Sequence, residues 1–497
     1  MKLNNCLLSL FLTSAISCLG ADAKVNFVFL ESDDHHFQAL GCMGEPLKTP
    51  NLDRLAARGV LFRHNVSQGT MCSPSRNALL TGSYPHNTGV YHNADGNMPK
   101  GIWTLPGALQ RAGYQTALIG KNHFKPPSPY TGRPGQKPAE MILQETRKLG
   151  FDYLHSVGGK VAAASGPRAN QTETDPYRLY LRDKGLLEKY EQEHSTPEAD
   201  ANSRIKMKVS VLQEEDYQDA YTARQAAEWI RTNHSIKPFF LWVDFVDPHP
   251  PAHPPLPYAG MYDWKTMRAP LPRPNTAEPV RGALRGVTDE QFKRFRAEYY
   301  AMITCLDAQI GKVLKALEEC GELENTVIVF AGDQGSMLGD HGLWGKGKFY
   351  KGSINSPLII AGTPGSLRGA KIDRPVELID VAPTVLELAK IGTPERARCF
   401  GHSLLPLLTG QGVYGRSAAF AEDAEDKMVV NERYKFVRSR TEPLLFDMQA
   451  DPDELNNLIG KLPQVEKEMG KLLDDWLAAT PPVRKANPSP VRKTVAK

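Results

Sequence analysis

The sequence has no strong net charge. It carries 60 Lys and Arg residues against 56 Asp and Glu residues, so the formal net charge at pH 7 is +4 over 497 residues. This balance creates no field that would attract the backbone of a nucleic acid, and we expect no nucleic-acid partner. After the N-terminal segment, no apolar run approaches the ~18 residues that a membrane-spanning helix needs, so we expect no stable transmembrane anchor.

The seven cysteines include no Cys-x-x-Cys pair. This excludes the spacing that is typical of zinc sites and of thioredoxin-like redox motifs. Cys305 and Cys320 fall in one helical pattern, and at ~1.5 Å per residue they lie too far apart along it to form a disulfide with each other. Five cysteines follow the N-terminal segment, and an odd number leaves one thiol over in an oxidising compartment.

Residues 1–23 are predicted to be a secretory signal. They combine a basic start at Lys2, an apolar stretch over residues 7–19 and small residues at the end of the segment. A buried N-terminal helix is the alternative, which we favour less because a strand pattern follows directly. Cys18 lies where a lipid-modified cysteine would be, but the residues before it fit a lipidation site poorly. We therefore expect export to the periplasm or beyond, with lipid anchoring left open.

The chain after residue 23 alternates short apolar or β-branched runs with helical patterns. This alternation predicts an α/β fold, with a large, mixed, mostly parallel sheet flanked by helices. The predicted strands are 25–31, 114–119, 238–246, 326–331 and 357–361. The predicted helices are 50–59, 288–321 and 380–392. Pro50 begins the first of these helices and Gly59 ends it.

A change of pattern near residue 395 predicts a second unit. Strand-like runs at 418–422, 427–439 and 444–448 are followed by an amphipathic helix near 465–479. We therefore divide the chain into a catalytic domain (24–395), a C-terminal α+β subdomain of antiparallel strands with one helix (396–480) and a disordered basic tail (481–497). Pro-rich or polar segments at 125–140, 155–210 and 250–286 are predicted to be long loops that carry substrate specificity.

Oxygen-rich motifs follow two of the predicted strands. Asp33 and Asp34 come directly after the first strand, and Asp333-Gln334-Gly335 follows strand 326–331. Because parallel strands end at one edge of a sheet, these carboxylates could share a hard cation. Taken alone, Asp-Asp is more often a solvated loop pair, and Asp333-Gln334-Gly335 is best explained by a turn with Gly335 at positive φ. Histidines in this kind of position, here His35 and His36, are metal ligands or substrate contacts about as often as they are plain loop residues.

The run Cys72-Ser73-Pro74-Ser75-Arg76 is followed by Asn77-Ala78-Leu79-Leu80-Thr81-Gly82. The proline and the apolar pair indicate a helix that starts just after Cys72. A cysteine at a helix N-terminus faces unpaired N–H groups, a location that suits anions. A buried core thiol is the alternative, but it would need neither the proline nor the arginine beside it.

These motifs resemble the type I (formylglycine-dependent) sulfatase family of the alkaline phosphatase-like superfamily. In that family Cys-x-Pro-Ser-Arg followed by Leu-Leu-Thr-Gly is read by a formylglycine-generating maturation enzyme, which converts the cysteine to formylglycine. The resemblance covers most of the chain in the expected order. Its further motifs are Asn26-Phe27-Val28, Gly120-Lys121-Asn122-His123, Gly150-Phe151-Asp152, Pro248-His249-Pro250-Pro251, Gly339-Asp340-His341-Gly342, Lys346 and Leu378-Ile379-Asp380-Val381-Ala382-Pro383-Thr384.

The resemblance implies a catalytic set and a metal site. The implied catalytic residues are Cys72, Arg76, Lys121, His123, His249 and Lys346, and the implied metal ligands are Asp33, Asp34, Cys72, Asp333 and Gln334. The metal would be Ca²⁺, with Mg²⁺ as the alternative. One hydroxyl of the hydrated aldehyde would attack sulfur, and the second would then expel sulfate.

The same resemblance suggests roles for the basic residues. Arg76 would orient the formylglycine and support the metal carboxylates, and His123 would assist the collapse of the intermediate. Lys121, Lys346 and His249 would hold sulfate or protonate the leaving oxygen. Lys346 fits the Gly-Leu-Trp-Gly-Lys spacing better than Lys348 does. The sequence departs from many relatives at Gln334 and over 350–357, which leaves substrate contacts in that segment in doubt.

Export and the usual range of the family favour a sulfated carbohydrate as the substrate. The first alternative is a phosphonate monoester or phosphodiester hydrolase of the same superfamily, and the second is a non-catalytic exported glycan-binding protein. Four aromatic residues are either sugar-stacking platforms or packing residues. They are Trp103, Tyr258, Trp264 and Trp344.

Overall fold

The structure is a computed structural model that describes residues 24–95, 97–126, 138–160, 175–195, 205, 207–275, 286–393 and 397–482. The predicted signal with Cys18, and nearly all of the predicted basic tail, lie outside the described residues. Within the described residues, no helix combines the length and the apolar character that crossing a bilayer requires.

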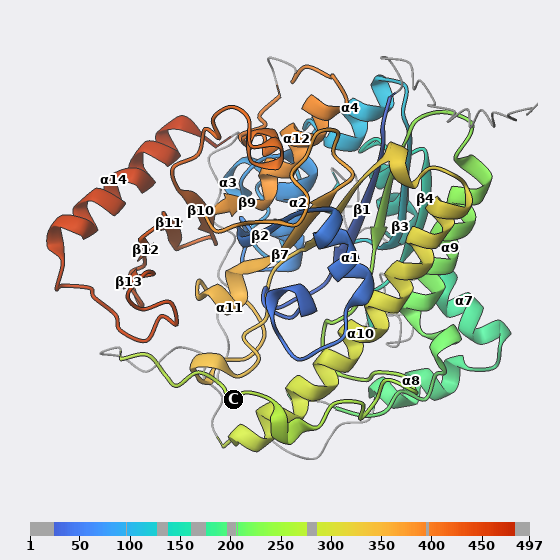
Figure 1. The fold of residues 1–497 in the computed structure, drawn as a ribbon, viewed down its shortest axis with the longest axis horizontal. Helices are drawn as coiled ribbons and strands as arrows, with labels where there is room; N and C mark the ends of the chain where they lie inside the picture. Colours follow the sequence, from blue (N-terminus) through green and yellow to red (C-terminus); the bar gives the residue numbers. More distant parts are fainter. Residues whose placement is uncertain are drawn as a thin grey trace, which may run out of the picture.

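A nine-stranded sheet forms the centre of the molecule (Figure 1). The strands lie in the order β4-β3-β5-β1-β6-β7-β2-β8, and β9 pairs with β2. Neighbouring strands run parallel except at β7, which is antiparallel to both β6 and β2. The predicted mixed, mostly parallel sheet is therefore confirmed. Its strands are β1 (Asn26–Ser32), β2 (Gly59–Val66), β3 (Gln115–Lys121), β4 (Tyr153–Val157), β5 (Phe239–Asp244), β6 (Thr326–Gly332), β7 (Asn355–Ala361), β8 (Ala370–Ile372) and β9 (Val376–Glu377).

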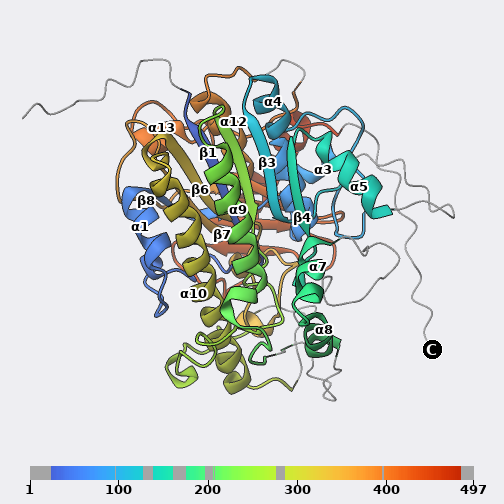
Figure 2. The same ribbon diagram turned by 90° about the vertical axis from the view of Figure 1, so that its right-hand side faces the viewer.

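Helices cover both faces of this sheet (Figure 2). In β1, Phe27 and Phe29 pack toward one face and Val28 and Leu30 toward the other, so the middle of the strand is apolar on both faces, as in parallel strands between two helical layers. One layer contains α1 (Pro50–Arg58), α9 (Gln218–Asn233) and α10 (Asp289–Glu319), and the other contains α2 (Cys72–Thr81), α4 (Leu105–Arg111) and α12 (Val381–Leu388). The remaining helices are α3 (Pro85–Thr88), α5 (Pro138–Arg147), α7 (Pro176–Asp183), α8 (Leu187–Ser195), α11 (Lys351–Ile354) and α13 (Leu405–Thr409).

A four-stranded antiparallel sheet follows, with α14 (Pro463–Ala479) packed on it at one side of the molecule (Figure 1). Its strands are β10 (Ala419–Glu422), β11 (Lys427–Val430), β12 (Tyr434–Arg438) and β13 (Leu444–Asp447). Trp476 of α14 stacks on Phe420 with ring centroids 4.9 Å apart. This unit has the predicted antiparallel strands and packing helix. Leu404 and Leu408 still pack with the core of the large sheet, and the boundary at 395 remains a prediction.

Several elements differ from the prediction. β2 and β4 are not among the predicted strands. β2 starts at Gly59, directly where α1 ends, and its polar second half coincides with a register shift between Phe62 and Asn65, so its apolar run is short. β4 lies at the edge of the sheet and is mostly half-exposed. The run 427–439 is a hairpin of two strands rather than one strand, and the segment 155–210 contains α7 and α8 rather than a continuous loop.

Candidate active site

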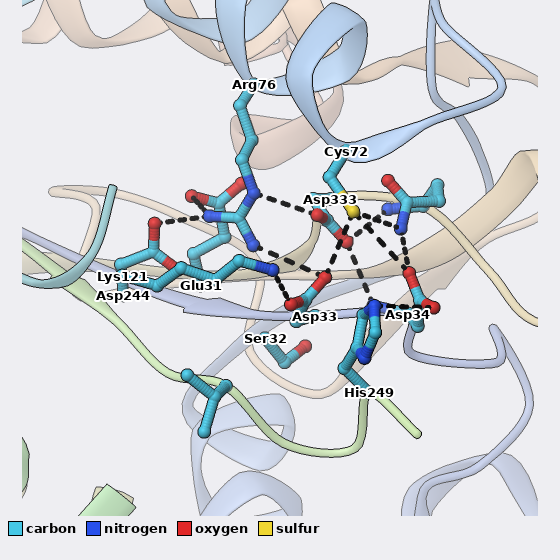
Figure 3. A network of polar contacts seen from close by, with 12 residues as sticks. Glu31, Ser32, Asp33, Asp34, Cys72, Arg76, Lys121, Asp244, His249 and Asp333 are labelled. Atoms are coloured by element: carbon cyan, nitrogen blue, oxygen red, sulfur yellow. Dashed lines mark hydrogen bonds and ion pairs between the residues drawn. The ribbon is translucent and has the colours of Figure 1, made fainter. Parts of the chain in front are cut away.

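The predicted site residues come from strand ends at one edge of the large sheet. Asp33 and Asp34 follow β1, Lys121 ends β3, His249 follows β5, and Asp333 follows β6. Carboxyl ends of parallel strands meet at one edge, which explains why residues about 300 positions apart in sequence are in contact there. Figure 3 shows these side chains pointing toward one another.

Cys72 is the first residue of α2, as the Pro-containing motif predicts, and it is fully buried. Its Sγ lies 2.7 Å from Nζ of Lys346, 3.4 Å from Oδ1 of Asp33 and 3.5 Å from Nε2 of Gln334. Burial, together with the charge of Asp33, raises the pKa of the thiol well above its usual value. An unmodified Cys72 is therefore a neutral thiol and a poor nucleophile.

Arg76, one turn further along α2, is buried among four carboxylates (Figure 3). Its Nε donates to Oδ2 of Asp333 at 2.8 Å, and its Nη1 donates to Oε2 of Glu31 at 2.9 Å and to the carboxylate of Asp244. Its Nη2 lies 3.7 Å from Oδ1 of Asp33. The guanidinium therefore joins the ends of β1, β5 and β6 beneath Cys72.

Two lysines approach the aspartates, one from the end of β3 and one from a loop. Lys121 forms an ion pair with Asp33. Lys346, which lies in the loop after β6, places Nζ 2.5 Å from Oδ1 of Asp34. Burial alone would lower the pKa of Lys346, but the surrounding carboxylates, led by Asp34, hold it well above its ordinary value. Both side chains are fixed cations beside the Cys72 sulfur.

The two predicted histidines differ in how closely they join this cluster. His249 places Nε2 3.7 Å from Oδ2 of Asp34, and its Nδ1 donates to the carbonyl of Pro250 at 2.5 Å. Burial lowers the pKa of His249 to about 4. His123 follows β3, where burial and the charge of Lys121 hold its pKa well below the usual value, and its Nδ1 has no hydrogen-bond partner among the described residues. His123 therefore borders the site rather than contacting Cys72.

The charges of the site fit a bound divalent cation. Five buried carboxylates face three cationic side chains, a formal excess of two negative charges. Burial raises the pKa of Asp333 to about 8, although the positive charge of Arg76 lowers it. The negative charges of Asp33 and Asp34 raise it further. A cation would relieve this repulsion. The carboxylates are Glu31, Asp33, Asp34, Asp244 and Asp333, and the cations are Arg76, Lys121 and Lys346.

The donor set also fits a hard cation. Oε1 of Gln334 is buried and has no hydrogen-bond partner among the described residues, which leaves it as a free oxygen ligand. Ligand atoms of Asp33, Asp34, Cys72 and His249 lie within 4.8 Å of one another. Three aspartates and an amide oxygen are the ligand types that Ca²⁺ and Mg²⁺ prefer.

Gly335 departs from the turn interpretation. It is not among the glycines with positive φ. A Cβ at this position would lie 2.3 Å from the carbonyl oxygen of Gly352 and 2.4 Å from that of Asn355. The glycine is therefore required by the close approach of the two backbones. The positive φ near the metal-binding loops belongs to Asp34, at 56°.

Comparisons with known proteins agree with this geometry. The sequence model of the family described as "Sulfatase" matches residues 25–391, and that described as "N-sulphoglucosamine sulphohydrolase, C-terminal" matches residues 339–479. The chain belongs to the sulfatase family. It is a sulfatase enzyme with the alkaline phosphatase-like fold, and this excludes the non-catalytic glycan-binding alternative.

Individual relatives of this sulfatase act on different esters. An arylsulfatase of Clostridium perfringens is 30% identical, over 88% of this chain and 90% of its own length. An N-acetylglucosamine-6-O-sulfatase of Bacteroides thetaiotaomicron is 28% identical, over 94% of this chain and 90% of its own length. The crystal structure of a phosphonate monoester hydrolase of Agrobacterium radiobacter has a TM-score of 0.76 at 25% identity, and the match covers 92% of this chain and 96% of that one.

Other candidate residues of the sulfatase have structural roles. His35 is buried between the hydroxyl of Ser32, 3.0 Å from Nδ1, and the carbonyl of Ala39, 2.9 Å from Nε2. The four aromatic residues proposed as sugar platforms or packing residues all pack against hydrophobic clusters, for instance Trp344 on Phe295 with centroids 4.4 Å apart. Packing therefore accounts for all four.

Glu31 and Asp244 were not predicted as site residues, although the sequence carries a signal for both. Each is a charged residue within a strand that is otherwise apolar, NFVFLES for β1 and FFLWVD for β5. A carboxylate in a strand covered by helices on both faces must be paired. That reasoning would have indicated a buried cation, which the structure identifies as Arg76.

A buried clamp also positions the His249 loop and was not predicted. Lys160, at the end of the segment after β4, donates from Nζ to the carbonyl of His249 at 3.1 Å and pairs with Asp247. The carbonyl of Asp247 accepts from the N–H of Asp33 at 3.0 Å. Asp219 of α9 accepts from the N–H groups of Val246 and Asp247. The clamp therefore links the His249 loop to the loop after β1 that carries Asp33.

We expect Lys160→Met to lower kcat about 10–100-fold with a smaller change in KM, because the His249 loop loses its anchor while Lys121 and Lys346 stay in place. Steady-state kinetics on a sulfate ester measures this. Lys312→Met, which removes an exposed ion pair with Glu214, is the control and should change kcat less than twofold. An unchanged kcat in Lys160→Met, with the protein folded, would remove Lys160 as a positioning residue.

Proposed function

We propose that this sulfatase is exported and releases sulfate from a sulfated carbohydrate, using a formylglycine made from Cys72 and a bound Ca²⁺, or Mg²⁺ in its place. The observation that carries the proposal is the position of Cys72, which begins α2 with its Sγ between Lys346 and the Asp33 carboxylate. A formylglycine-generating enzyme would be its maturation partner. The N-acetylglucosamine-6-O-sulfatase relative supports a sugar substrate.

Asp33, Asp34, Asp333 and Gln334 would hold the metal next to residue 72. When bound, the metal and the formylglycine together supply a Lewis acid and a hydroxyl nucleophile. Arg76 keeps the carboxylates of β1, β5 and β6 in place under this position.

The basic side chains bind the ester and supply the proton that its leaving oxygen takes up. Lys121 and Lys346 provide fixed positive charge at the place where a sulfate group would meet residue 72, and they stabilise the charge that grows on its oxygens. The Pro250 carbonyl accepts from Nδ1 of His249, so Nε2 is the nitrogen left to face the leaving oxygen. Nε2 would deliver a proton only from the doubly protonated ring, which the negative charge of a bound sulfate ester would favour. His123, at the border of the site, would assist release of sulfate.

The substrate assignment is tested by a sulfate-release screen over defined sulfated mono- and oligosaccharides, with aryl sulfates as comparison substrates. We expect kcat/KM on at least one sulfated sugar to exceed that on aryl sulfates. Release from aryl sulfates alone would overturn the carbohydrate proposal.

A second function is favoured by the likeness to the phosphonate monoester hydrolase. The same screen therefore includes a phosphonate monoester and a phosphodiester with the same leaving group as the aryl sulfate. We expect the sulfate ester to have the highest kcat/KM. A phosphonate or phosphodiester rate that is higher would establish the second function in place of the first.

Metal removal is expected to abolish activity and to lower stability. Without the cation, the buried carboxylates repel one another, so adding Ca²⁺ at ~100 times its Kd should restore about 2.7 kcal/mol of unfolding free energy. Urea unfolding and kinetics before and after chelation measure both effects. Asp34→Asn should lose most of the Ca²⁺ response. A chelated enzyme with full activity and unchanged stability would contradict the metal assignment.

A further inference from the structure

A second cluster of metal-binding side chains lies outside the active site. Glu193 and His194 are near the end of α8, and His253 lies in the Pro-rich segment after β5. One ligand atom from each of the three residues lies within 4.8 Å of the other two. We propose that Glu193, His194 and His253 form a separate site for a divalent transition metal, with Zn²⁺ as the best match.

The buried atoms of this cluster lack other partners. His253 is 2% exposed, and neither of its ring nitrogens has a hydrogen-bond partner among the described residues. Its Nδ1 lies 2.7 Å from Oε1 of Glu193, which is ion-pair distance, so these two atoms face each other and neither has a further partner among the described residues. Nε2 of His253 has no partner within the described part of the chain, and leaving a buried polar atom unsatisfied is unfavourable. A bound cation would satisfy it.

Contacts on the outer side of the cluster orient two of the ligands. Oε2 of Glu193 accepts from the N–H of Val211 at 2.9 Å and from Oγ of Ser210 at 3.3 Å, which turns Oε1 toward His253. Nδ1 of His194 donates to the carbonyl of Tyr190 at 3.0 Å. The lone pair of His194 is therefore on Nε2. Metal-binding histidines usually have this kind of support, with one nitrogen donating to an oxygen and the other free to bind.

The surroundings accept a cation. A small cavity of about 10 Å³, roughly the size of one water molecule, lies between the three residues. Lys160 also lines it, but its charge is neutralised by the buried carboxylate of Asp247. Burial lowers the pKa of His194 to about 4, so the ring is neutral and able to bind metal at neutral pH.

The ligand types select the metal. Two imidazoles and one carboxylate, with water in the fourth position, form the nitrogen-rich set that Zn²⁺ takes, whereas Ca²⁺ and Mg²⁺ prefer all-oxygen sites such as the one at Asp33 and Asp34. The ion would join α8 to the loop that also carries His249, four residues before His253. Its role would be to hold that loop against α8.

The test is metal binding by the full chain, independent of sulfatase activity. The protein is stripped with chelator, saturated with Ca²⁺ and titrated with Co²⁺ and then Zn²⁺. We expect one equivalent of Co²⁺ with the visible absorption of a tetrahedral nitrogen-ligated ion, displaced by one equivalent of Zn²⁺. Absence of this signal, or octahedral Co²⁺ displaced by Ca²⁺, would overturn the proposal.

Variants localise the ion. Glu193→Gln combined with His253→Gln should weaken Zn²⁺ binding by more than ~10–100-fold, the loss that removal of outer contacts alone produces. His234→Gln is the matched control, since its Nδ1 contacts the carbonyls of α9, and it should bind Zn²⁺ as the parent does. If the double variant does not fold, His194→Gln, which is only half-buried, replaces it. Unchanged Zn²⁺ affinity in these variants would refute the site.

Discussion

Cys72→Ala is expected to lose sulfate-ester hydrolysis by roughly 10⁴–10⁶-fold, the range found when a covalent nucleophile is removed. The reason is that the nucleophile is made from this side chain, and neither Lys346 nor Asp33 beside it can form and release a covalent sulfate in its place. Initial rates at saturating substrate, with protein produced alongside a formylglycine-generating enzyme, measure the effect. Lysine and metal contacts should still bind the ester, so KM should change much less than kcat.

Cys320→Ser is the matched control. This thiol lies at the C-terminal end of α10, is partly exposed and is unpaired. Its replacement should leave kcat unchanged. Mass spectrometry of the Cys72 peptide from the active enzyme should show an aldehyde in place of the thiol. Full activity in Cys72→Ala, or an active parent enzyme whose Cys72 remains entirely a thiol, would refute the formylglycine assignment.

Arg76→Met is expected to lower the unfolding free energy by about 3–5 kcal/mol, because it leaves buried carboxylates without their shared cation. Glu31, Asp244 and Asp333 each contact the guanidinium, and all are buried. Urea unfolding in the presence of Ca²⁺ measures the loss. Arg54→Met, which removes an exposed pair with Glu318, should cost less than ~1 kcal/mol and serves as the control.

A double-mutant cycle separates charge from packing in this cluster. Burial raises the pKa of Asp244 to about 7 even beside Arg76, so its charge is readily given up, and unlike Asp333 it is not one of the proposed metal ligands. Asp244→Asn should therefore recover part of the stability that Arg76→Met loses. Additive effects of the two substitutions would mean that Arg76 acts through packing volume and not through its charge.

Local hydrophobic patterns in the sequence explain which strands and helices were predicted and which were not. Apolar strands flanked by helical patterns were enough to predict β1, β3, β5, β6 and β7 and the helices α1, α10 and α14. β2 was not predicted, because it follows α1 without a loop and its second half is polar. Periodicity also carries no information on strand direction, and it did not show that β7 runs antiparallel to its neighbours.

The chemistry-bearing residues were accessible from the sequence for a simple reason. Asp33, Cys72, Lys121 and Asp333 stand at the ends of recognisable elements, and the parallel-strand rule brings such ends to one edge. Their motifs, spread over most of the chain, also carry the family resemblance. The sequence alone was therefore sufficient for the sulfatase family and the fold class, whereas the roles of the candidate site residues stay a prediction.

Only the tertiary structure determined which buried side chains form ion pairs and which line the same cavity. Arg76 meets Glu31 and Asp244 because three strands from distant parts of the chain end beneath α2, and no local pattern encodes that meeting. Likewise Glu193 and His253 are 60 residues apart, in segments that were predicted as separate loops. They meet only because α8 packs against the loop after β5. The pairing of buried charges depends on where side chains lie in three dimensions. Because an unpaired charge is costly when buried, a buried charged side chain must have a partner of opposite charge next to it.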